Sequence, residues 1–335
     1  MNKTFQRFAA AAVVALAACS VRPSFAPTLA GSAAIRSSSA AGPANHIYLA
    51  NSFMTKSGTV TEYGPAGTSR LQTIAFPATA LAGSGGLIAA GSKSNIQEYA
   101  AGTNTVKRTI TQGVNEPMAL AFDGSGNLYA VNFAGSRSIV EYARGTAAPL
   151  RTISLAAWPS RAVAIDAAGN LYVGVYDKSA GDVLIYSPGQ AQPARTIPIP
   201  HANEYDYPAA MLLDSAQRLY VATNYGHIYI YEPGATAPTY VITYPDTLNS
   251  IALDKTGNLW AVGNGPLVEY AATNWKLVKS IVTGGPPIQV GVDGNGNVYV
   301  GAIGVLEEYD AASGAKVRSV TKGVGTPIWM VFASR

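Results

Sequence analysis

The chain is poor in the residue types that carry most enzyme chemistry. It has one cysteine and three histidines among 335 residues, and only 13% of its residues are charged, where about a quarter is usual. The single cysteine, Cys19, excludes an internal disulfide and leaves the rest of the chain without a thiol nucleophile. Beyond the N-terminal leader, no apolar run is long enough for a membrane-spanning helix.

The excess of positive charge lies entirely at the N-terminus. The formal net charge is +4, and Lys3, Arg7, Arg22 and Arg36 all precede residue 45, where no acidic residue occurs. The remainder of the chain therefore carries equal numbers of basic and acidic groups. Nucleic-acid binding depends on basic patches that neutralise phosphates, so we expect no nucleic-acid partner.

The first residues have the pattern of a secretory leader. Lys3 and Arg7 form a basic start, and the apolar run from Phe8 to Ala17 is too short to span a bilayer as a stable helix. The run ends in Leu-Ala-Ala-Cys at residues 16–19. This sequence resembles the bacterial lipobox, in which the cysteine is lipidated after cleavage just before it. The alternative is an ordinary secretory signal that is cleaved near Ala26.

Three segments follow from this pattern. We predict a signal peptide over residues 1–18, a lipidated Cys19 with a flexible Ala/Ser/Pro-rich tether over residues 19–44, and a folded domain over residues 45–335. The expected partner is a membrane, through the lipid anchor. The expected location is the bacterial cell envelope, on its periplasmic or cell-surface side.

A repeat of about 40 residues runs through the folded domain. Each unit holds a short apolar strand, Asp, a Gly-Asn turn, a Leu-Tyr-Val-like strand and a strand that ends in Glu-Tyr or a similar pair. The final tyrosine recurs at Tyr63, Tyr99, Tyr142, Tyr186, Tyr231, Tyr270 and Tyr309. A period of this length, made only of short strands, predicts an all-β, seven-bladed β-propeller with four-stranded antiparallel blades.

Within each repeat we label the strands a to d from the central channel outward. Strand a is the apolar run before the Asp, such as Met118–Asp123, and the turn after it predicts a positive φ at its Gly. Strand d reads Arg-Thr-Ile, as at Arg108–Ile110, and its charges are expected to guard an exposed edge. The domain opens on a b strand at His46 and closes on an a strand at residues 327–332. This order predicts a one-plus-three closure, in which the C-terminal strand completes the first blade.

The repeat resembles that of the NHL-repeat propellers, which also reads Pro, apolar strand, Asp, Gly-Asn, Leu-Tyr-Val. The resemblance covers residues 45–335. It implies the propeller fold, but it does not choose a function, because the superfamily includes protein-binding and RNA-binding modules, lactonases and lyases. It also implies that ligands meet the face formed by the b–c and d–a loops, at the mouth of the channel.

Polar residues in these loops form the candidate ligand-binding set. The least repetitive stretch is the insertion His201–Tyr207, which holds one His, two carboxylates and two Tyr. Function on repeat scaffolds usually lies where a loop departs from the repeat, although a solvated surface loop is the simpler interpretation. The candidates are Glu116, Asn132, Arg161, His201, Glu204, Asp206, Asn224, His227 and Asp246.

Two classes of function remain open. The first is a monomeric binding or scaffolding module for a protein or a small-molecule ligand. The second is a metal-dependent lactonase or lyase, because gluconolactonase-like relatives hold a divalent ion with Glu, Asn and Asp, and streptogramin-lyase-like relatives use His and Glu on this face. Its cofactor would be a divalent cation such as calcium, which prefers oxygen ligands. No spacing in the sequence identifies catalytic residues, and the repeated tyrosines are interpreted as packing between blades.

Overall fold

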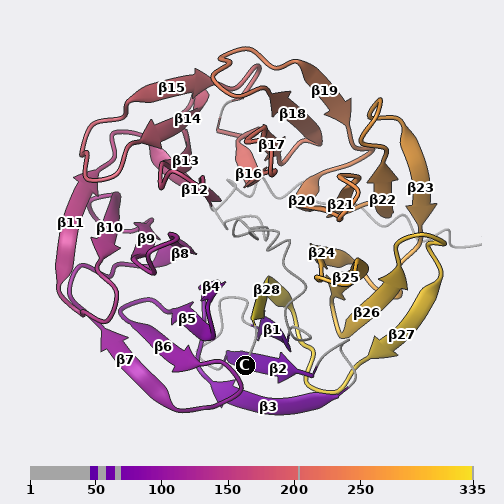
Figure 1. Ribbon diagram of the computed structural model, residues 1–335, viewed down its shortest axis with the longest axis horizontal. Helices are drawn as coiled ribbons and strands as arrows, with labels where there is room; N and C mark the ends of the chain where they lie inside the picture. Colours follow the sequence, from indigo (N-terminus) through magenta and orange to yellow (C-terminus); the bar gives the residue numbers. More distant parts are fainter. Residues whose placement is uncertain (1–45, 52–57, 65–68, 203, 334–335) are drawn as a thin grey trace, which may run out of the picture.

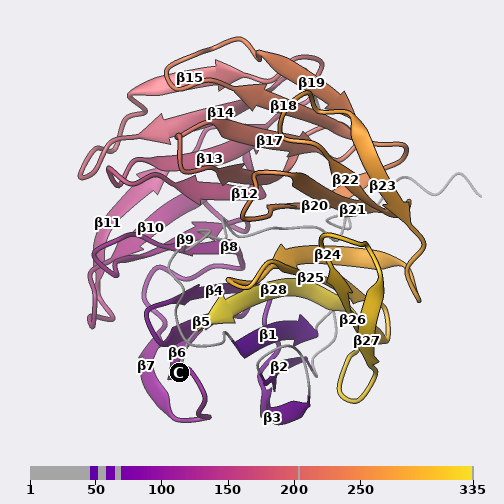
Figure 2. The same cartoon turned by 45° about the vertical axis from the view of Figure 1, so that its right-hand side comes forward.

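Seven four-stranded antiparallel sheets form a closed ring around a central axis (Figure 1). The computed structural model describes residues 46–51, 58–64, 69–202 and 204–333, so Cys19, the leader and the tether lie outside the described residues. Figure 2 shows the sheets standing face to face around the ring. This arrangement confirms the predicted seven-bladed β-propeller. Within the described ranges, no helix is long and apolar enough to cross a membrane.

The strands fall into four concentric layers, which correspond to the predicted strands a to d. The innermost strands are β28 (Pro327–Ala333), β4 (Ala80–Ser84), β8 (Pro117–Phe122), β12 (Trp158–Ile165), β16 (Pro208–Leu213), β20 (Leu248–Leu253) and β24 (Pro287–Val292). The second layer is β1 (His46–Asn51), β5 (Leu87–Gly91), β9 (Leu128–Asn132), β13 (Leu171–Tyr176), β17 (Leu219–Thr223), β21 (Leu259–Gly263) and β25 (Asn297–Ala302). The third layer is β2 (Thr59–Tyr63), β6 (Ile96–Ala100), β10 (Ser138–Tyr142), β14 (Gly181–Tyr186), β18 (His227–Tyr231), β22 (Leu267–Tyr270) and β26 (Val305–Asp310). The outer layer is β3 (Arg70–Ala75), β7 (Val106–Ile110), β11 (Pro149–Ser154), β15 (Arg195–Pro198), β19 (Tyr240–Thr243), β23 (Leu277–Ile281) and β27 (Lys316–Val320).

The first blade is closed by the end of the chain. Its strand order is β28-β1-β2-β3, and β28 pairs antiparallel with β1, with Leu49 opposite Met330. Blades 2 to 7 then follow in chain order from β4. Trp329 on β28 is fully buried, and its Nε1 donates to the Thr79 carbonyl at the start of blade 2 at 2.7 Å. The predicted one-plus-three closure is therefore confirmed.

An Asp side chain builds the turn between strands a and b. In blade 6, Asp254 Oδ1 accepts the backbone N–H of Thr256 at 2.8 Å and of Asn258 at 3.0 Å, and Gly257 has a φ of 84°. The equivalent glycines Gly126, Gly169 and Gly296 also have positive φ, as predicted. In blade 5 a glutamine takes this position, Gln217, with a φ of 64°. Residues other than Gly rarely adopt a positive φ, so the contacts of the surrounding turn hold the backbone of Gln217 in this conformation.

The tyrosines at the ends of the third-layer strands pack between blades. All seven are at most 4% exposed. Several also donate a hydrogen bond to a backbone carbonyl of the preceding blade, as Tyr142 does to Gln112 at 2.8 Å and Tyr270 does to Thr243 at 3.1 Å. This burial confirms the packing interpretation.

A polar pair joins strands c and d in five of the blades, and in blade 3 this pair is part of a polar row that also includes strand b. In blade 3, Glu141 lies opposite Tyr129 on one side and Arg151 on the other, and Arg151 Nε donates to Glu141 at 2.8 Å. Arg151 also donates to the carbonyl of Gln190 in the next blade. Its side chain is only 13% exposed. The sequence predicts that the strand-d cations protect an exposed sheet edge. In the structure Arg151 instead pairs with the buried Glu141 and connects its blade to the next one.

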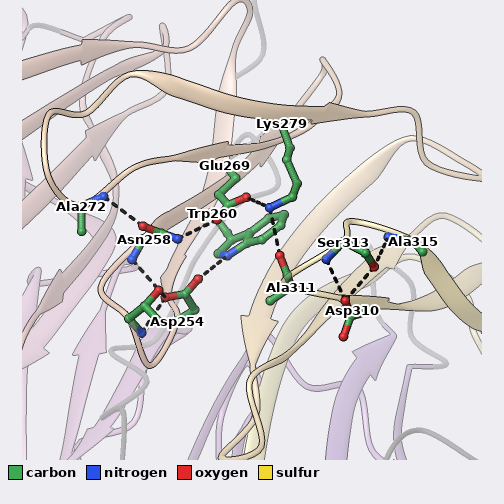
Figure 3. A network of polar contacts seen from close by, with 11 residues as sticks. Asp254, Asn258, Trp260, Glu269, Ala272, Lys279, Asp310, Ala311, Ser313 and Ala315 are labelled. Carbon is green, nitrogen blue, oxygen red and sulfur yellow. Dashed lines mark hydrogen bonds and ion pairs between the residues drawn. The ribbon is translucent and has the colours of Figure 1, made fainter.

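The same row recurs with small changes in other blades. Figure 3 shows it in blade 6, where Lys279 contacts Glu269 and the carbonyl of Ala311 in blade 7. The equivalent ion pairs are Glu98–Arg108 in blade 2 and Glu308–Arg318 in blade 7, and in blade 1 Gln72 donates to Glu62.

Candidate functional site

The insertion between β15 and β16 is held to blade 5 by an asparagine. Asn224 follows β17 and accepts the backbone N–H of Tyr207 on its Oδ1 at 2.8 Å. Its Nδ2 donates to the Tyr205 carbonyl at 2.6 Å. Both polar groups of the amide are thereby engaged with the backbone. The first role of Asn224 is to position the insertion.

Two other blades use the same clamp. Asn132 accepts the backbone N–H of Asn115 at 3.0 Å and donates to the Gly113 carbonyl at 2.8 Å. Asn51 accepts the N–H of Gly325 and donates to the Gly323 carbonyl, both at 3.1 Å. The candidates Asn132 and Asn224 therefore support the d–a loops through both of their amide groups. Asn132 ends β9 and Asn224 directly follows β17, and the sequence does not show that their amides are already occupied.

A histidine–carboxylate pair lies beside the clamp in blade 5. His227 Nδ1 is 3.5 Å from Asp206 Oδ2, and Asp206 Oδ1 accepts the N–H of Tyr225 at 3.0 Å. Asp206 is buried, whereas His227 is half-buried and its ring stacks on Tyr229 at 5.9 Å between centroids. This pair joins two predicted residues that are distant in sequence.

Arg161 is the most unusual charge on this face. It lies on the innermost strand β12, where the pairing with β13 shifts register between Pro159 and Val163. Its Nε and NH1 are inaccessible to solvent and have no hydrogen-bond partner among the described residues. Tyr176 and Tyr207 are its electrostatic neighbours. Their rings stack on each other with centroids 4.5 Å apart and planes at 20°.

The electrostatics of this group favour an anion. Burial lowers the pKa of Arg161, and Tyr207 and Tyr176 oppose that shift. Burial raises the pKa of Tyr176 to about 12, with Tyr207 adding to the rise and Arg161 reducing it. Tyr176 is therefore protonated at neutral pH and can donate a hydrogen bond. A small anion beside Arg161 would meet a guanidinium and a phenolic hydroxyl together.

Other candidates make contacts of their own. Glu116 forms an exposed ion pair with Lys93 at 3.0 Å. Asp246 Oδ1 accepts the N–H of Thr247 at 2.6 Å. The Tyr205 hydroxyl donates a hydrogen bond to the Glu204 carboxylate, which raises the pKa of Tyr205. His201 is exposed and has a φ of 62°. The structure thus brings together Arg161, Asp206, Asn224 and His227 around the insertion.

Two aromatic residues of this group, Tyr176 and Tyr207, are not among the nine candidates, although Tyr207 ends the insertion that the sequence singles out. Tyr176 ends β13 and Tyr207 directly precedes β16, so both positions border loops of the mouth face. Their stacking joins blade 4 to blade 5. No position within a single repeat specifies such a contact between blades.

The acidic and histidine candidates do not gather into one cluster in the described part of the chain. No group of three or more His, Cys, Asp or Glu side chains within the described ranges is placed to hold a metal ion. The oxygen-bearing candidates are instead divided between loop clamps, one ion pair and the His227–Asp206 pair. These residues therefore do not fit a divalent cation held by several carboxylates.

Comparison with known proteins supports the fold but does not indicate a function. No protein-family model matches the chain, and no curated protein matches it in sequence. Many solved structures match its fold. One of them, described as Kuenenia stuttgartiensis hydrazine synthase, aligns with a TM-score of 0.63 and 13% sequence identity, over 79% of this chain and 90% of that chain. At this identity the similarity shows the β-propeller fold alone.

Proposed function

We propose that this protein is a cell-envelope lipoprotein whose NHL-like propeller binds a small anionic ligand at the channel mouth. The observation that carries the binding role is the guanidinium of Arg161 beside Tyr176 and Tyr207, whose Nε and NH1 are inaccessible to solvent and have no acceptor among the described residues. The anchoring role is supported by the leader and by the lipobox-like residues 16–19.

An unpaired buried charge is costly, and this cost is the argument for a ligand. Removing one partner from a buried ion pair typically destabilises a protein by about 3–5 kcal/mol, because the other charge remains without compensation. Part of this cost applies to Arg161, which is half-buried and whose inaccessible Nε and NH1 have no acceptor among the described residues. A bound anion would supply the missing acceptor. A cation at this position lowers stability when no anion is bound, so a ligand-binding role accounts for Arg161 better than a structural role does.

The surroundings of Arg161 are suited to binding because they are held in place. Asn224 fixes the backbone on both sides of Asp206, and the Tyr176–Tyr207 stack limits the movement of both rings. A site that is already arranged loses little conformational entropy when its ligand arrives. The insertion therefore acts as a rigid wall of the site.

A thermal-shift series with inorganic sulfate, acetate, succinate and citrate tests this proposal. We expect at least one of these anions to raise the melting temperature of the wild-type protein. Arg161→Met should melt higher than the wild type without anions, because an uncompensated charge is removed. It should also lose most of the anion-dependent rise, because the acceptor site is gone.

The exposed Arg144 provides a matched control. Arg144→Met removes the same charge from the surface and should leave both the melting temperature and the anion response unchanged. The proposal is overturned if Arg161→Met melts lower than the wild type and keeps the full anion response. It is equally overturned if none of the four anions affects the wild-type protein.

A further inference from the structure

Blade 4 breaks the polar row in a way that no other blade does. In blades 2, 3, 6 and 7, a glutamate on strand c pairs with a cation on strand d. Blade 5 has lost both members, because Ile230 lies opposite Tyr240. Blade 4 has lost only the glutamate, because Ile185 lies opposite Arg195. Blade 5 therefore lacks both charges of the pair, whereas blade 4 keeps the strand-d cation without the strand-c glutamate.

Arg195 keeps its contact with the next blade but has no carboxylate partner. Its NH2 donates to the Ala235 carbonyl of blade 5 at 2.9 Å, as the equivalent arginines do in their blades. No ion pair joins Arg195 to any acidic residue in the described part of the chain. The nearby Asp166 does not serve, because its two oxygens accept the backbone and side-chain N–H groups of Asn170 at 2.8 and 2.7 Å.

A cavity of about 500 Å³ lies at this position, between blades 4 and 5. It opens on the face that carries the a–b and c–d turns, since residues 166–168 and 233–235 form its rim. Its polar lining is Asp166, Tyr172, Arg195, Ser215, Gln217 and Glu232, and Ile185, Ile197 and Leu219 provide apolar lining. Arg195 is the one cation among these lining residues. Ligand sites typically have volumes of about 300–1,000 Å³ and combine apolar walls with a few polar groups.

We propose that this cleft binds a small aliphatic carboxylate, whose carboxylate group takes the position of the glutamate that blade 4 lacks. In blade 3 that glutamate accepts hydrogen bonds from Arg151 at 2.8 Å and from Tyr129 at 3.1 Å. Arg195 and Tyr172 occupy the equivalent positions in blade 4, opposite Ile185 on either side.

The cleft can supply both donors to a ligand. Tyr172 OH is 3.4 Å from Asp166 Oδ2, a long and therefore weak hydrogen bond. The hydroxyl can thus turn to a better acceptor, and the guanidinium has donors beyond the one that Ala235 uses. The aliphatic part of the ligand would lie against Ile185, Ile197 and Leu219. This site is separate from the channel mouth, and it does not depend on the function proposed there.

Methyl NMR with sodium pentanoate tests the proposal at the site itself. The methyl resonances of Ile185 and Ile197 should shift and saturate with pentanoate, whereas Ile153 in blade 3 should not respond. Pentanamide, which has a similar shape but no charge, should bind at least about tenfold more weakly, because the charge-assisted contact with Arg195 is lost.

A pair of substitutions at one repeat position completes the test. Ile185→Glu should restore the internal ion pair, raise the melting temperature and abolish the pentanoate shift at Ile197. Ile230→Glu places the same group opposite Tyr240, where strand d has no cation and the nearby Arg218 is already paired with Asp214, and should lower the melting temperature. The proposal is overturned if pentanoate and pentanamide act alike. It is also overturned if Ile185→Glu keeps pentanoate binding or lowers the melting temperature as much as Ile230→Glu.

Discussion

Single hydroxyl groups contribute unequally to the contacts between blades. The third-layer tyrosines occupy equivalent positions and are all buried. Tyr142 donates to the Gln112 carbonyl, whereas the hydroxyl of Tyr231 is buried without a partner among the described residues. A buried hydroxyl without a hydrogen bond lowers the free energy of unfolding, and one with a partner raises it modestly. Equivalent residues can therefore differ in the sign of their contribution.

Two Tyr→Phe substitutions should reveal this difference in sign. Tyr231→Phe should leave stability unchanged or raise it by up to about 1 kcal/mol, because it removes an unpaired polar group. Tyr142→Phe should lower stability by about 1 kcal/mol or more, because it leaves the Gln112 carbonyl without its donor. Urea unfolding measures both, and equal losses in the two variants would contradict the assignment.

Glu307 makes stability depend on acidity. Burial favours its neutral form, but the Gly284 N–H, Lys316 and Tyr309 outweigh burial and hold the pKa of Glu307 below its ordinary value of 4.5. The unfolded chain therefore binds the proton more readily than the folded chain does. The stabilisation is present above the unfolded pKa and is lost as the pH falls through the folded pKa.

Urea unfolding between about pH 3 and pH 7 should show this loss, with stability decreasing on the acid side. Glu307→Gln should be less stable than the wild type at neutral pH and should show a shallower acid-side decrease. Glu232→Gln, at an exposed position, should keep the wild-type slope. An unchanged slope in Glu307→Gln would show that other carboxylates control the acid response.

At the scale of the strand, the outer layer is held from within. The cations of β7, β11 and β23 reach past their own blade to a backbone carbonyl of the next one. Each is balanced by a buried glutamate on the neighbouring strand. Adjacent blades are thus joined by polar contacts near the rim as well as by the apolar inner strands. Where the glutamate is missing, in blade 4, a cavity takes its place.

The C-terminal strand is the element on which closure of the ring depends. Deleting residues 327–335 should remove β28, expose the edge of β1 and leave Thr79 without the Trp329 donor. We expect aggregation or the loss of cooperative unfolding, because an unpaired strand edge invites association. Calorimetry and light scattering measure these effects.

The control deletes residues 334–335 alone, which keeps β28 intact, and should melt like the wild type. If the longer truncation also melts like the wild type, the closure does not contribute to stability.

At the scale of the whole molecule, the propeller brings residues from distant repeats to common faces. The mouth face holds Arg161 with the insertion of blade 5, and the opposite face holds the cleft around Arg195. Both sites lie between blades 4 and 5. These are also the blades in which strand c lacks its glutamate, at Ile185 and Ile230. The sites thus occur where the repeat is least regular.

Anchoring of the whole molecule is tested at Cys19. In a bacterial host, Cys19→Ser should move the protein from the membrane fraction to the soluble fraction, because a stable lipid anchor cannot form without the thiol. Mass spectrometry of the wild-type N-terminus should find a lipidated Cys19 as the first residue. A wild-type protein that is soluble and begins near Ala26 would instead support the ordinary secretory signal.

The sequence by itself determined the architecture of this protein. The period of about 40 residues, the Asp and Gly of the a–b turns and the strand order at the two ends predict seven blades and their closure, and the structure confirms them. Such features are local, since each follows from the geometry of a strand or a turn within one repeat. The missing glutamates are also visible in the sequence, although their meaning requires the partner across the strand.

Only the tertiary structure decided which polar residues could serve a ligand. The sequence predicts Asn132 and Arg161 alike in the mouth loops, but both lie on strands: the first is engaged by backbone groups, while the second has an Nε and an NH1 without an acceptor among the described residues. That difference depends on the distance and orientation of neighbouring loops. The same holds for the cavity beside Arg195, because its walls come from two blades. Contacts between repeats depend on how the blades pack, and no single repeat contains that information.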